Sequence, residues 1–255
     1  MFWWRQRVAE DLEVAFTDVE AGNLALHVGD EPAAVRDRRA GLASAMGVDA
    51  AALLFMNQVH SARVARADQL VPVGPSGPAA ASDGGTMDAM VSPSGLHPMA
   101  VMVADCLPVV LAGFEPDTGA VAATAVVHAG RQGLAAGIIP AAVRALEGLP
   151  YGHAGDGRRP LVQAWIGPSV CGRCYEVPEE MAAEVAAAVP GSASRTRQGT
   201  AGLDLAAGAE MQLAGMNVQT RRIAGCTLEE GRLFSHRRDQ RTGRLAGLVW
   251  RGQAK

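Results

Sequence analysis

The chain has 255 residues, of which 49% are hydrophobic and 19% are charged, so it is long enough to bury a core and has the composition of a globular protein. Its net charge of −3 argues against a general binder of nucleic acid or of anionic membranes, and no run approaches the ~20 apolar residues of a membrane helix. Charged residues interrupt the start of the chain where a signal peptide needs its apolar segment, so we expect a cytoplasmic protein whose four cysteines are reduced.

The first third of the chain predicts a helix, two strands and a loop. A helix is expected within residues 28–48, with Asp30 as its cap, Pro32 in its first turn and Gly47 at its end. Strand-like stretches follow at residues 52–56 and 59–66. Residues 71–85 are rich in proline, glycine and alanine and predict a loop. Apolar strands resume directly after it, so we favour a loop within one domain over a linker between two.

The rest of the chain mixes strands with helices. Residues 97–113 and 119–130 are long apolar runs, typical of strands that are covered on both faces. Further strands are predicted at residues 160–167, 218–225 and 243–250. Helices are predicted at residues 133–148, where Pro140 kinks the helix or marks its start, at 178–191, and at 203–218, capped by Asp204. The sequence therefore predicts a mixed α/β protein of the α+β class, with one domain over residues 1–255.

Three residues combine metal-ligand chemistry with positions at strand ends. His60 lies in "NQVHSARV", Cys106 in "ADCLPVV" and His128 in "VVHAGRQG". Two imidazoles and a thiolate are a good ligand set for zinc, and three protein ligands leave a fourth position for water, as in catalytic zinc sites. The alternative, a buried free cysteine and two ordinary histidines, stays open because ligands this far apart in sequence form no local motif.

Two features flank these candidate ligands. After His128 a glycine-flanked turn opens a helix, and its free N–H groups together with Arg131 favour an anionic group such as phosphate. The alternative is a plain strand-to-helix turn. Asp105 precedes Cys106, and neighbours in a regular strand face opposite ways. We therefore expect Asp105 to bond a backbone N–H or to orient a metal ligand rather than to act as a general base.

Two further clusters have less certain chemistry. Cys171 and Cys174 form a C-x-x-C pair, which is a redox pair, half of a structural zinc site, part of a four-cysteine site with Cys106 and Cys226, or two free thiols in a turn. A basic segment at 233–247 lies on a solvated surface, or one of its arginines binds phosphate. We expect three histidines to be structural or on the surface: His27, His97 and His153.

Eight stretches, in order along nearly the whole chain, are similar to motifs of the laccase-domain family, also called YfiH-type or peptidoglycan-editing-factor-like. They are "NLALHVGD", "NQVHSARV", "MDAMV", "ADCLPVVL", "VVHAGRQGL", "IGPSVCGRCYEV", "LDLAAGAEMQL" and "CTLEEGRLFSHRRDQRTGR". The chain departs from the family's usual "HAGWRG", because Arg131 stands where tryptophan is common and Gln132 where arginine is common.

The resemblance implies a layered fold of packed β-sheets with helices outside, and a Zn²⁺ site at His60, Cys106 and His128, which also carry the catalysis. It implies phosphorolysis of adenosine, inosine and methylthioadenosine and deamination of adenosine, in which zinc activates a water molecule. The partners are then purine nucleosides and phosphate, and the protein is a monomer or a small homo-oligomer. The substrate contacts expected in matching motifs are Asn23, Gln58, Arg131, Tyr175, Glu176, Arg237 and Arg238.

Three other functions compete with this interpretation. One is a zinc hydrolase that edits peptidoglycan precursors by removing a misincorporated amino acid. Another is a non-catalytic, zinc-stabilised binding module, which predicts a closed four-ligand site that uses Cys171 and Cys174. A redox protein that uses the same two cysteines is the third. A copper polyphenol oxidase is disfavoured, because laccase-type copper clusters need many histidines in His-x-His pairs, and this chain has six histidines and no such pair.

Overall fold

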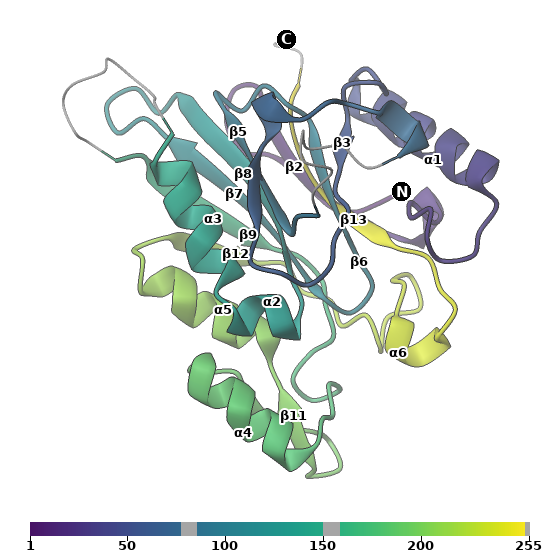
Figure 1. Ribbon diagram of the computed structural model, residues 1–255, viewed down its shortest axis with the longest axis vertical. Helices are drawn as coiled ribbons and strands as arrows, with labels where there is room; N and C mark the ends of the chain where they lie inside the picture. The colour runs from purple at the N-terminus through teal and green to yellow at the C-terminus, as the bar shows by residue number, and fades with distance from the viewer. Residues whose placement is uncertain (78–85, 150–158, 253–255) are drawn as a thin grey trace.

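The computed structural model describes residues 1–77, 86–149 and 159–252. Two large β-sheets pack face to face, and helices cover their outer faces. Figure 1 shows α3 (Ile138–Glu147) and α5 (Leu205–Ala214) on one side of the sheets and α1 (Pro32–Met46) on the opposite side. This arrangement confirms the predicted mixed class with packed sheets and external helices.

The first sheet has five strands in the order β1-β2-β13-β6-β3, with bounds Phe2–Arg7, Leu12–Thr17, Leu245–Arg251, Met99–Val103 and Leu54–Phe55. The second has six strands in the order β12-β9-β7-β8-β5-β4, with bounds Gln219–Arg222, Leu161–Ile166, Leu107–Phe114, Val121–Ala129, Ala89–Pro93 and Val64–Arg66. Strand β13 pairs antiparallel with both β2 and β6, so the C-terminal strand lies at the centre of the first sheet.

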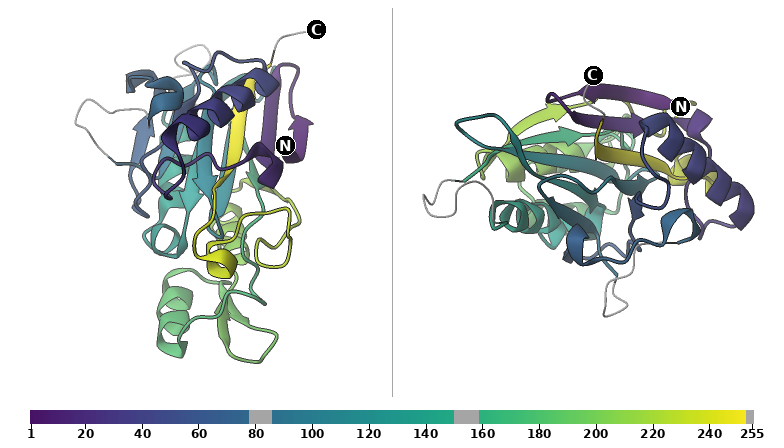
Figure 2. Two further views of the ribbon diagram at one scale, coloured as in Figure 1. Left: turned by 90° about the vertical axis from the view of Figure 1, so that its right-hand side faces the viewer. Right: turned by 90° about the horizontal axis from the view of Figure 1, so that it is seen from above.

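The remaining elements lie around these sheets. The two-stranded sheet pairs β10 (Ala193–Arg195) with β11 (Ala201–Leu203), and Figure 2 shows it with α4 (Glu179–Ala188) at one end of the molecule, beyond the large sheets. The short helices are α2 (Arg131–Ala135), α6 (His236–Asp239) and the 3-10 turns η1 (Val19–Ala21), η2 (Ala67–Gln69) and η3 (Gly74–Ser76). The N-terminal hairpin β1–β2 and the hairpin β10–β11 were not predicted from the sequence.

The strands β6, β7 and β8 are buried along their whole length, as their apolar sequences predict. Alternate residues of β7 face opposite layers, because side chains alternate along a strand. Val109 and Leu111 pack with the helices α3 and α5, whereas Val110 and Ala112 pack against the first sheet. A third apolar cluster lies under α1, where Leu42 packs with Leu248 and Trp250. The molecule is therefore layered as helix, sheet, sheet and helices.

The apolar run at 97–113 is divided between the two sheets. Strand β6 belongs to the five-stranded sheet and β7 to the six-stranded sheet, and residues 104–106 cross between them. Asp105 has a φ of 80°, a left-handed conformation that ends β6 and redirects the chain. Strand β6 thus ends at Val103, and the turn at Asp105 leads the chain through Cys106 into β7.

The helix predictions are confirmed in type and corrected in detail. Residues 133–148 form two helices, because Gly137 adopts a φ of 84° between α2 and α3, and Pro140 lies in the first turn of α3. Asp204 caps α5 by accepting a hydrogen bond from the Ala207 N–H at 3.0 Å. Asp30 does not cap α1: its carboxylate pairs with Arg38 and accepts from the Asn23 amide.

Several predictions fall on shorter elements or on undescribed residues. The strands expected at 52–56 and 59–66 are reduced to β3 and β4, because residues 57–63 form the loop that carries His60. His153 and part of the loop at 71–85 lie outside the described residues. Within the described parts of the chain, no helix combines the length and the apolar character needed to cross a bilayer.

Candidate metal centre

His60, Cys106 and His128 converge from three separate segments of the chain. Their candidate ligand atoms all lie within 4.8 Å of one another, and Cys106 Sγ lies 3.5 Å from His60 Nε2. The rings of His60 and His128 meet edge to face with centroids 4.7 Å apart. Two imidazole nitrogens and a thiolate fit a tetrahedral ion with one open position. The residues present therefore fit a bound metal, and we call them the triad.

Strand pairing explains why the triad forms. Strands β7 and β8 are antiparallel neighbours, and Pro108 at the start of β7 pairs with His128 near the end of β8. Cys106, two residues before Pro108, therefore lies beside His128. Gly130 completes the fit: a Cβ there would lie 2.4 Å from His60 Cδ2 and 3.1 Å from Cys106 Sγ. A larger residue would displace two of the three triad side chains.

Asp88 holds both histidines of the triad and was not predicted. Its carboxylate accepts hydrogen bonds from the His60 N–H at 2.9 Å, the Ser61 N–H at 2.6 Å and the Ser61 hydroxyl at 2.7 Å. It also bonds His128 Nδ1 at 2.8 Å, which leaves Nε2 as the ring nitrogen available for a metal. His60 has a φ of 64°, which this set of bonds supports. The sequence signal was an aspartate at the start of an apolar strand, in "MDAMV".

Asp88 is fully buried, and the hydrogen bonds that its carboxylate accepts favour the ionised form. Burial alone would raise its pKa, but the hydrogen bonds from His128 and Ser61 lower it to about 2. Burial also disfavours the charged forms of Cys106 and His128. Their mutual attraction nevertheless lowers the pKa of Cys106 and raises that of His128, and Asp88 raises the latter further. Cys106 and His128 thus each favour the charged form of the other, and a cation that binds both would replace the proton on His128 Nε2.

Two cavities meet at the triad. The larger, of about 370 Å³, is lined by residues from five segments: Ala104, Asp105, Cys106, Arg131, Val170, Tyr175, Leu205, His236, Arg237 and Gln240. The smaller, of about 230 Å³, contains all three triad residues and is lined by His27, Gln58, His60, Met102, Val103, Ala104, Cys106, His128, His236 and Arg244. Ala104, Cys106 and His236 line both cavities, so the Cys106 thiol lies at their junction.

Three of the predicted substrate residues line the larger cavity. They are Tyr175, Arg131 at the start of α2 and Arg237 in α6. Both arginines interact electrostatically with the Tyr175 hydroxyl. The guanidinium carbon of Arg237 lies 4.9 Å from the centre of the Tyr175 ring. Burial and the nearby Cys106 raise the pKa of Tyr175, while the two arginines lower it. This cavity therefore joins an aromatic wall to two cations beside Cys106.

Gln58 lines the smaller cavity, but its side chain is fully engaged by the backbone. Its amide nitrogen donates to the Met102 carbonyl at 2.7 Å, and its amide oxygen accepts from the Met102 N–H at 2.8 Å. These two bonds join the loop that carries His60 to strand β6. The residue therefore positions the His60 loop against the first sheet.

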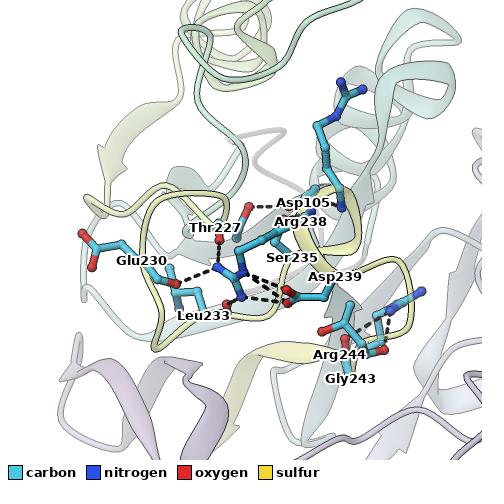
Figure 3. Close-up of polar contacts among 11 residues, drawn as sticks. Asp105, Thr227, Glu230, Leu233, Ser235, Arg238, Asp239, Gly243 and Arg244 are labelled. Atoms are coloured by element: carbon cyan, nitrogen blue, oxygen red, sulfur yellow. Dashed lines mark hydrogen bonds and ion pairs between the residues drawn. The ribbon is translucent and has the colours of Figure 1, made fainter.

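Three other predicted residues do not line either cavity. Asn23 is buried, and its side chain bonds the backbone of Ala25 and Arg244. Glu176 is exposed, and it is its backbone carbonyl that accepts from Arg237. Arg238 points into its own loop, where it donates to the carbonyl oxygens of Thr227, Glu230 and Leu233, as Figure 3 shows. The side chains of Asn23 and Arg238 therefore support loops around the site, whereas Glu176 contributes through its backbone.

The Asp105 carboxylate accepts hydrogen bonds from groups outside the triad. Its carboxylate accepts from the Thr227 hydroxyl at 2.5 Å and from the Arg237 N–H at 2.7 Å. The predicted bond to a backbone N–H is therefore present, and both oxygens are engaged. Asp105 connects the segment before β7 to the loop after β12 and to α6.

Sequence reasoning missed several residues of the cavities. His27, expected to be structural or on the surface, lines the smaller one together with Arg244. Burial lowers the pKa of Arg244, whereas Cys106 and Asp105 raise it, so this cation faces the site. His236 and Gln240 line the larger cavity from α6 and its end. No periodicity marks these positions, because they lie in irregular loops or in the four-residue helix α6.

A second group of metal-ligand side chains lies apart from the triad. It contains Cys171, Cys174, Cys226 and Glu229, whose candidate ligand atoms also lie within 4.8 Å of one another. One alternative from the sequence was a metal site made of all four cysteines. The structure contradicts it, because Cys106 lies in the triad and the fourth side chain beside Cys171, Cys174 and Cys226 is Glu229. Among residues 1–77, 86–149 and 159–252, all four cysteines are free thiols.

Comparison with known proteins supports one family. The family model described as multi-copper polyphenol oxidoreductase laccase matches residues 13–252. A protein of Streptomyces griseus named purine nucleoside phosphorylase is 46% identical over 247 residues, which cover 92% of this chain and 93% of that protein. A protein of Streptomyces coelicolor with the same name is 45% identical, covering 93% and 90% of the two chains.

Solved structures share the fold. A Neisseria meningitidis protein of the DUF152 family superposes with a TM-score of 0.75 at 29% identity, covering 95% of each chain. The Bacillus licheniformis protein YfiH superposes with a TM-score of 0.76 at 22% identity, covering 96% of this chain and 98% of that one. The motif order along the chain, the fold and the matched family model agree, and this chain belongs to the multi-copper polyphenol oxidoreductase laccase family, the laccase-domain or YfiH family.

Proposed function

We propose that the protein is a zinc-dependent purine nucleoside phosphorylase. The observation that carries the proposal is the triad at the junction of two cavities, the larger of which has an aromatic wall and two arginines. The names of the two Streptomyces relatives, both more than 40% identical to this chain, support the same reaction. The larger cavity also has a volume within the ~300–1,000 Å³ of small-molecule sites.

Zinc suits the triad better than copper does. His60, Cys106 and His128 would hold the ion, and Asp88 would orient His128 in the way typical of histidine ligands to zinc. A multicopper oxidase needs several copper ions bound by clustered histidines, and the described residues bring only two histidines into this group. Bound zinc would supply Lewis-acid polarisation of an oxygen ligand.

Phosphorolysis needs an anion site beside the sugar, and Arg131 and Arg237 offer one. A phosphate oxygen forms a bond to C1′ of the sugar while the bond from C1′ to the purine nitrogen breaks. The electron pair of that bond leaves with the purine, which takes up a proton. The two guanidinium groups neutralise the phosphate and hold it beside Cys106, and the Tyr175 ring forms a wall for the apolar faces of the substrate.

The substrates we propose are adenosine, inosine and methylthioadenosine. Adenosine is also deaminated, with water replacing the exocyclic amino group and ammonia leaving. The same triad serves both reactions in this proposal, since the smaller cavity that contains it opens beside Cys106 to the larger one. The catalytic group comprises His60, Cys106 and His128.

The first test measures purine base release from the three nucleosides, with and without phosphate, for the wild type and Cys106→Ala. We expect release that depends on phosphate in the wild type and is abolished in the variant, because the thiolate ligand is gone. Ammonia release from adenosine is followed in parallel. No release from any nucleoside by folded, zinc-loaded wild type would refute the proposal and favour hydrolysis of a peptidoglycan precursor.

A second experiment tests the two arginines that line the larger cavity. Replacing Arg237 or Arg131 by glutamine removes a charge-assisted hydrogen bond of about 1.5–3 kcal/mol, so the KM for phosphate is expected to rise tenfold or more. Arg195→Gln is the matched control, because Arg195 pairs with Glu179 on the exposed surface of the β10–β11 segment. An unchanged KM for phosphate in both cavity variants would show that phosphate binds elsewhere.

A further inference from the structure

The second group of metal-ligand side chains is built by two loops at one edge of the six-stranded sheet. Cys171 and Cys174 follow β9, and Cys226 and Glu229 follow β12. Strands β9 and β12 are parallel neighbours, so both loops leave the sheet at the same edge. A parallel bridge between Ser169 and Cys226 continues the pairing into the loops. The sheet itself therefore brings the four side chains together.

The backbone closes a turn at Cys171 and directs one N–H group at a sulfur atom of the cluster. The N–H groups of Cys174 and Tyr175 both donate to the Cys171 carbonyl at 2.9 Å, which closes a tight turn. The Cys171 N–H donates to Cys226 Sγ at 3.4 Å. Hydrogen bonds of this kind orient ligands and stabilise thiolates around metal ions.

We propose that Cys171, Cys174, Cys226 and Glu229 bind a second zinc ion in a closed, structural site. Three thiolates and one carboxylate complete a tetrahedral zinc site with no open position, unlike the triad. The carboxylate of Glu229 also accepts a hydrogen bond from Arg197, and ligating carboxylates are commonly held in this way. This proposal does not depend on the reaction that the triad performs.

A redox pair explains the same residues less well. A disulfide between any two of the three cysteines would leave the third thiol and Glu229 without a role. A metal site uses all four side chains, as the distances among their candidate ligand atoms allow.

The position of the site suggests what the ion stabilises. The first loop continues from Cys174 directly to Tyr175, in the wall of the larger cavity. In the second loop, Thr227 follows Cys226 and donates to Asp105, which in turn accepts from the Arg237 N–H. An ion that joins the two loops would hold both Tyr175 and Arg237 in position. Its loss is expected to loosen one wall of the cavity while leaving the triad intact.

The test counts zinc ions per chain after purification with zinc, for wild type, Cys106→Ala, Cys174→Ser and the double variant. We expect two ions in the wild type, one in each single variant and none in the double variant. Cobalt substitution identifies the ligands. Cys106→Ala should keep most of the thiolate-to-cobalt charge-transfer absorption, because three of the four thiolates remain, whereas Cys174→Ser should lose most of it.

A matched pair of glutamate variants provides a second test in case Cys174→Ser fails to fold. Glu229→Gln should weaken binding of one zinc ion, measured by competition with a chelator, and should lower the melting temperature. Glu230→Gln, at the next position, should do neither. One zinc ion per folded wild-type chain, or a mass lower by two hydrogens that reports a disulfide, would overturn the proposal. Failure of nucleoside cleavage alone would leave it standing, because these measurements do not use activity.

Discussion

Gly130 and Asp88 shape the triad although neither offers a ligand atom in it. Asp88 bonds the backbone of the His60 loop and the His128 ring, so one buried carboxylate sets the directions of two ligands. Gly130 leaves the space that the His60 ring occupies. The chemistry of the site therefore depends on residues whose types, an aspartate and a glycine, are common throughout soluble proteins.

Gly130→Ala is expected to disrupt metal binding while the protein remains folded. The added Cβ would meet His60 Cδ2 at 2.4 Å and Cys106 Sγ at 3.1 Å, so the His60 loop must shift and the three ligand atoms separate. Zinc affinity should fall at least tenfold, measured by competition with a chelator. Gly41→Ala in α1 is the control, because its Cβ meets no atom within 4 Å and alanine favours the helix. Equal zinc affinity in the two variants would refute this account of Gly130.

The segment from β12 to α6 is the element that connects the cavities to the rest of the fold. Thr227 is fully buried and bonds Asp105, and Arg238 bonds the carbonyl oxygens of Thr227 and Glu230 within the same segment (Figure 3). Asp105 then accepts from the N–H of Arg237 at the start of α6. The helix is only four residues long, so these bonds rather than its own turns determine where Arg237 lies.

Thr227→Val tests this role. The change removes a hydrogen bond to a carboxylate in a buried position, so the free energy of unfolding should fall by about 1.5–3 kcal/mol. The KM for phosphate should also rise, because Arg237 loses part of its support, while kcat changes less. Denaturant unfolding and steady-state kinetics measure the two effects. Thr220→Val on the exposed strand β12 is the control and should alter neither quantity.

For the whole molecule, one domain over residues 1–255 stays a prediction, and the sharing of two apolar clusters among many elements is the reason to expect it. Strands β7 and β8 contribute to both the cluster under the helices and the cluster between the sheets. Residues of α4 and β11, at the end of the molecule in Figure 2, belong to the same cluster as α3 and α5. Among the described residues, these shared clusters join the two large sheets and the helices into one core.

We therefore expect a single cooperative unfolding transition. Trp250 reports on the cluster under α1 and Trp165 on the cluster between the sheets, so fluorescence of single-tryptophan variants should follow the same denaturant curve as far-ultraviolet circular dichroism. Two separated transitions would instead indicate two domains. The measurement is best made on zinc-loaded protein, because partial metal loss produces mixed populations.

The sequence by itself predicted most strands and helices and the residues of the triad. Strands such as β7 and β8 are recognisable because burial on both faces requires a continuous apolar run, and α5 because Asp204 caps it. His60, Cys106 and His128 stood out because imidazole and thiolate groups beside strand ends are chemically distinctive. These signals are local, and each can be read from a few consecutive residues.

Only the tertiary structure decided which distant residues meet. The assignment of β6 and β7 to different sheets, the bonds from Asp88 to two segments, and the meeting of Cys226 with Cys171 and Cys174 follow from strand order. The hairpins β1–β2 and β10–β11 and the place of His27 in the cavity lining also escaped prediction. The physical reason is that partners in a sheet and contacts between loops are chosen by packing between segments far apart in sequence, which leaves no periodic signal within either segment.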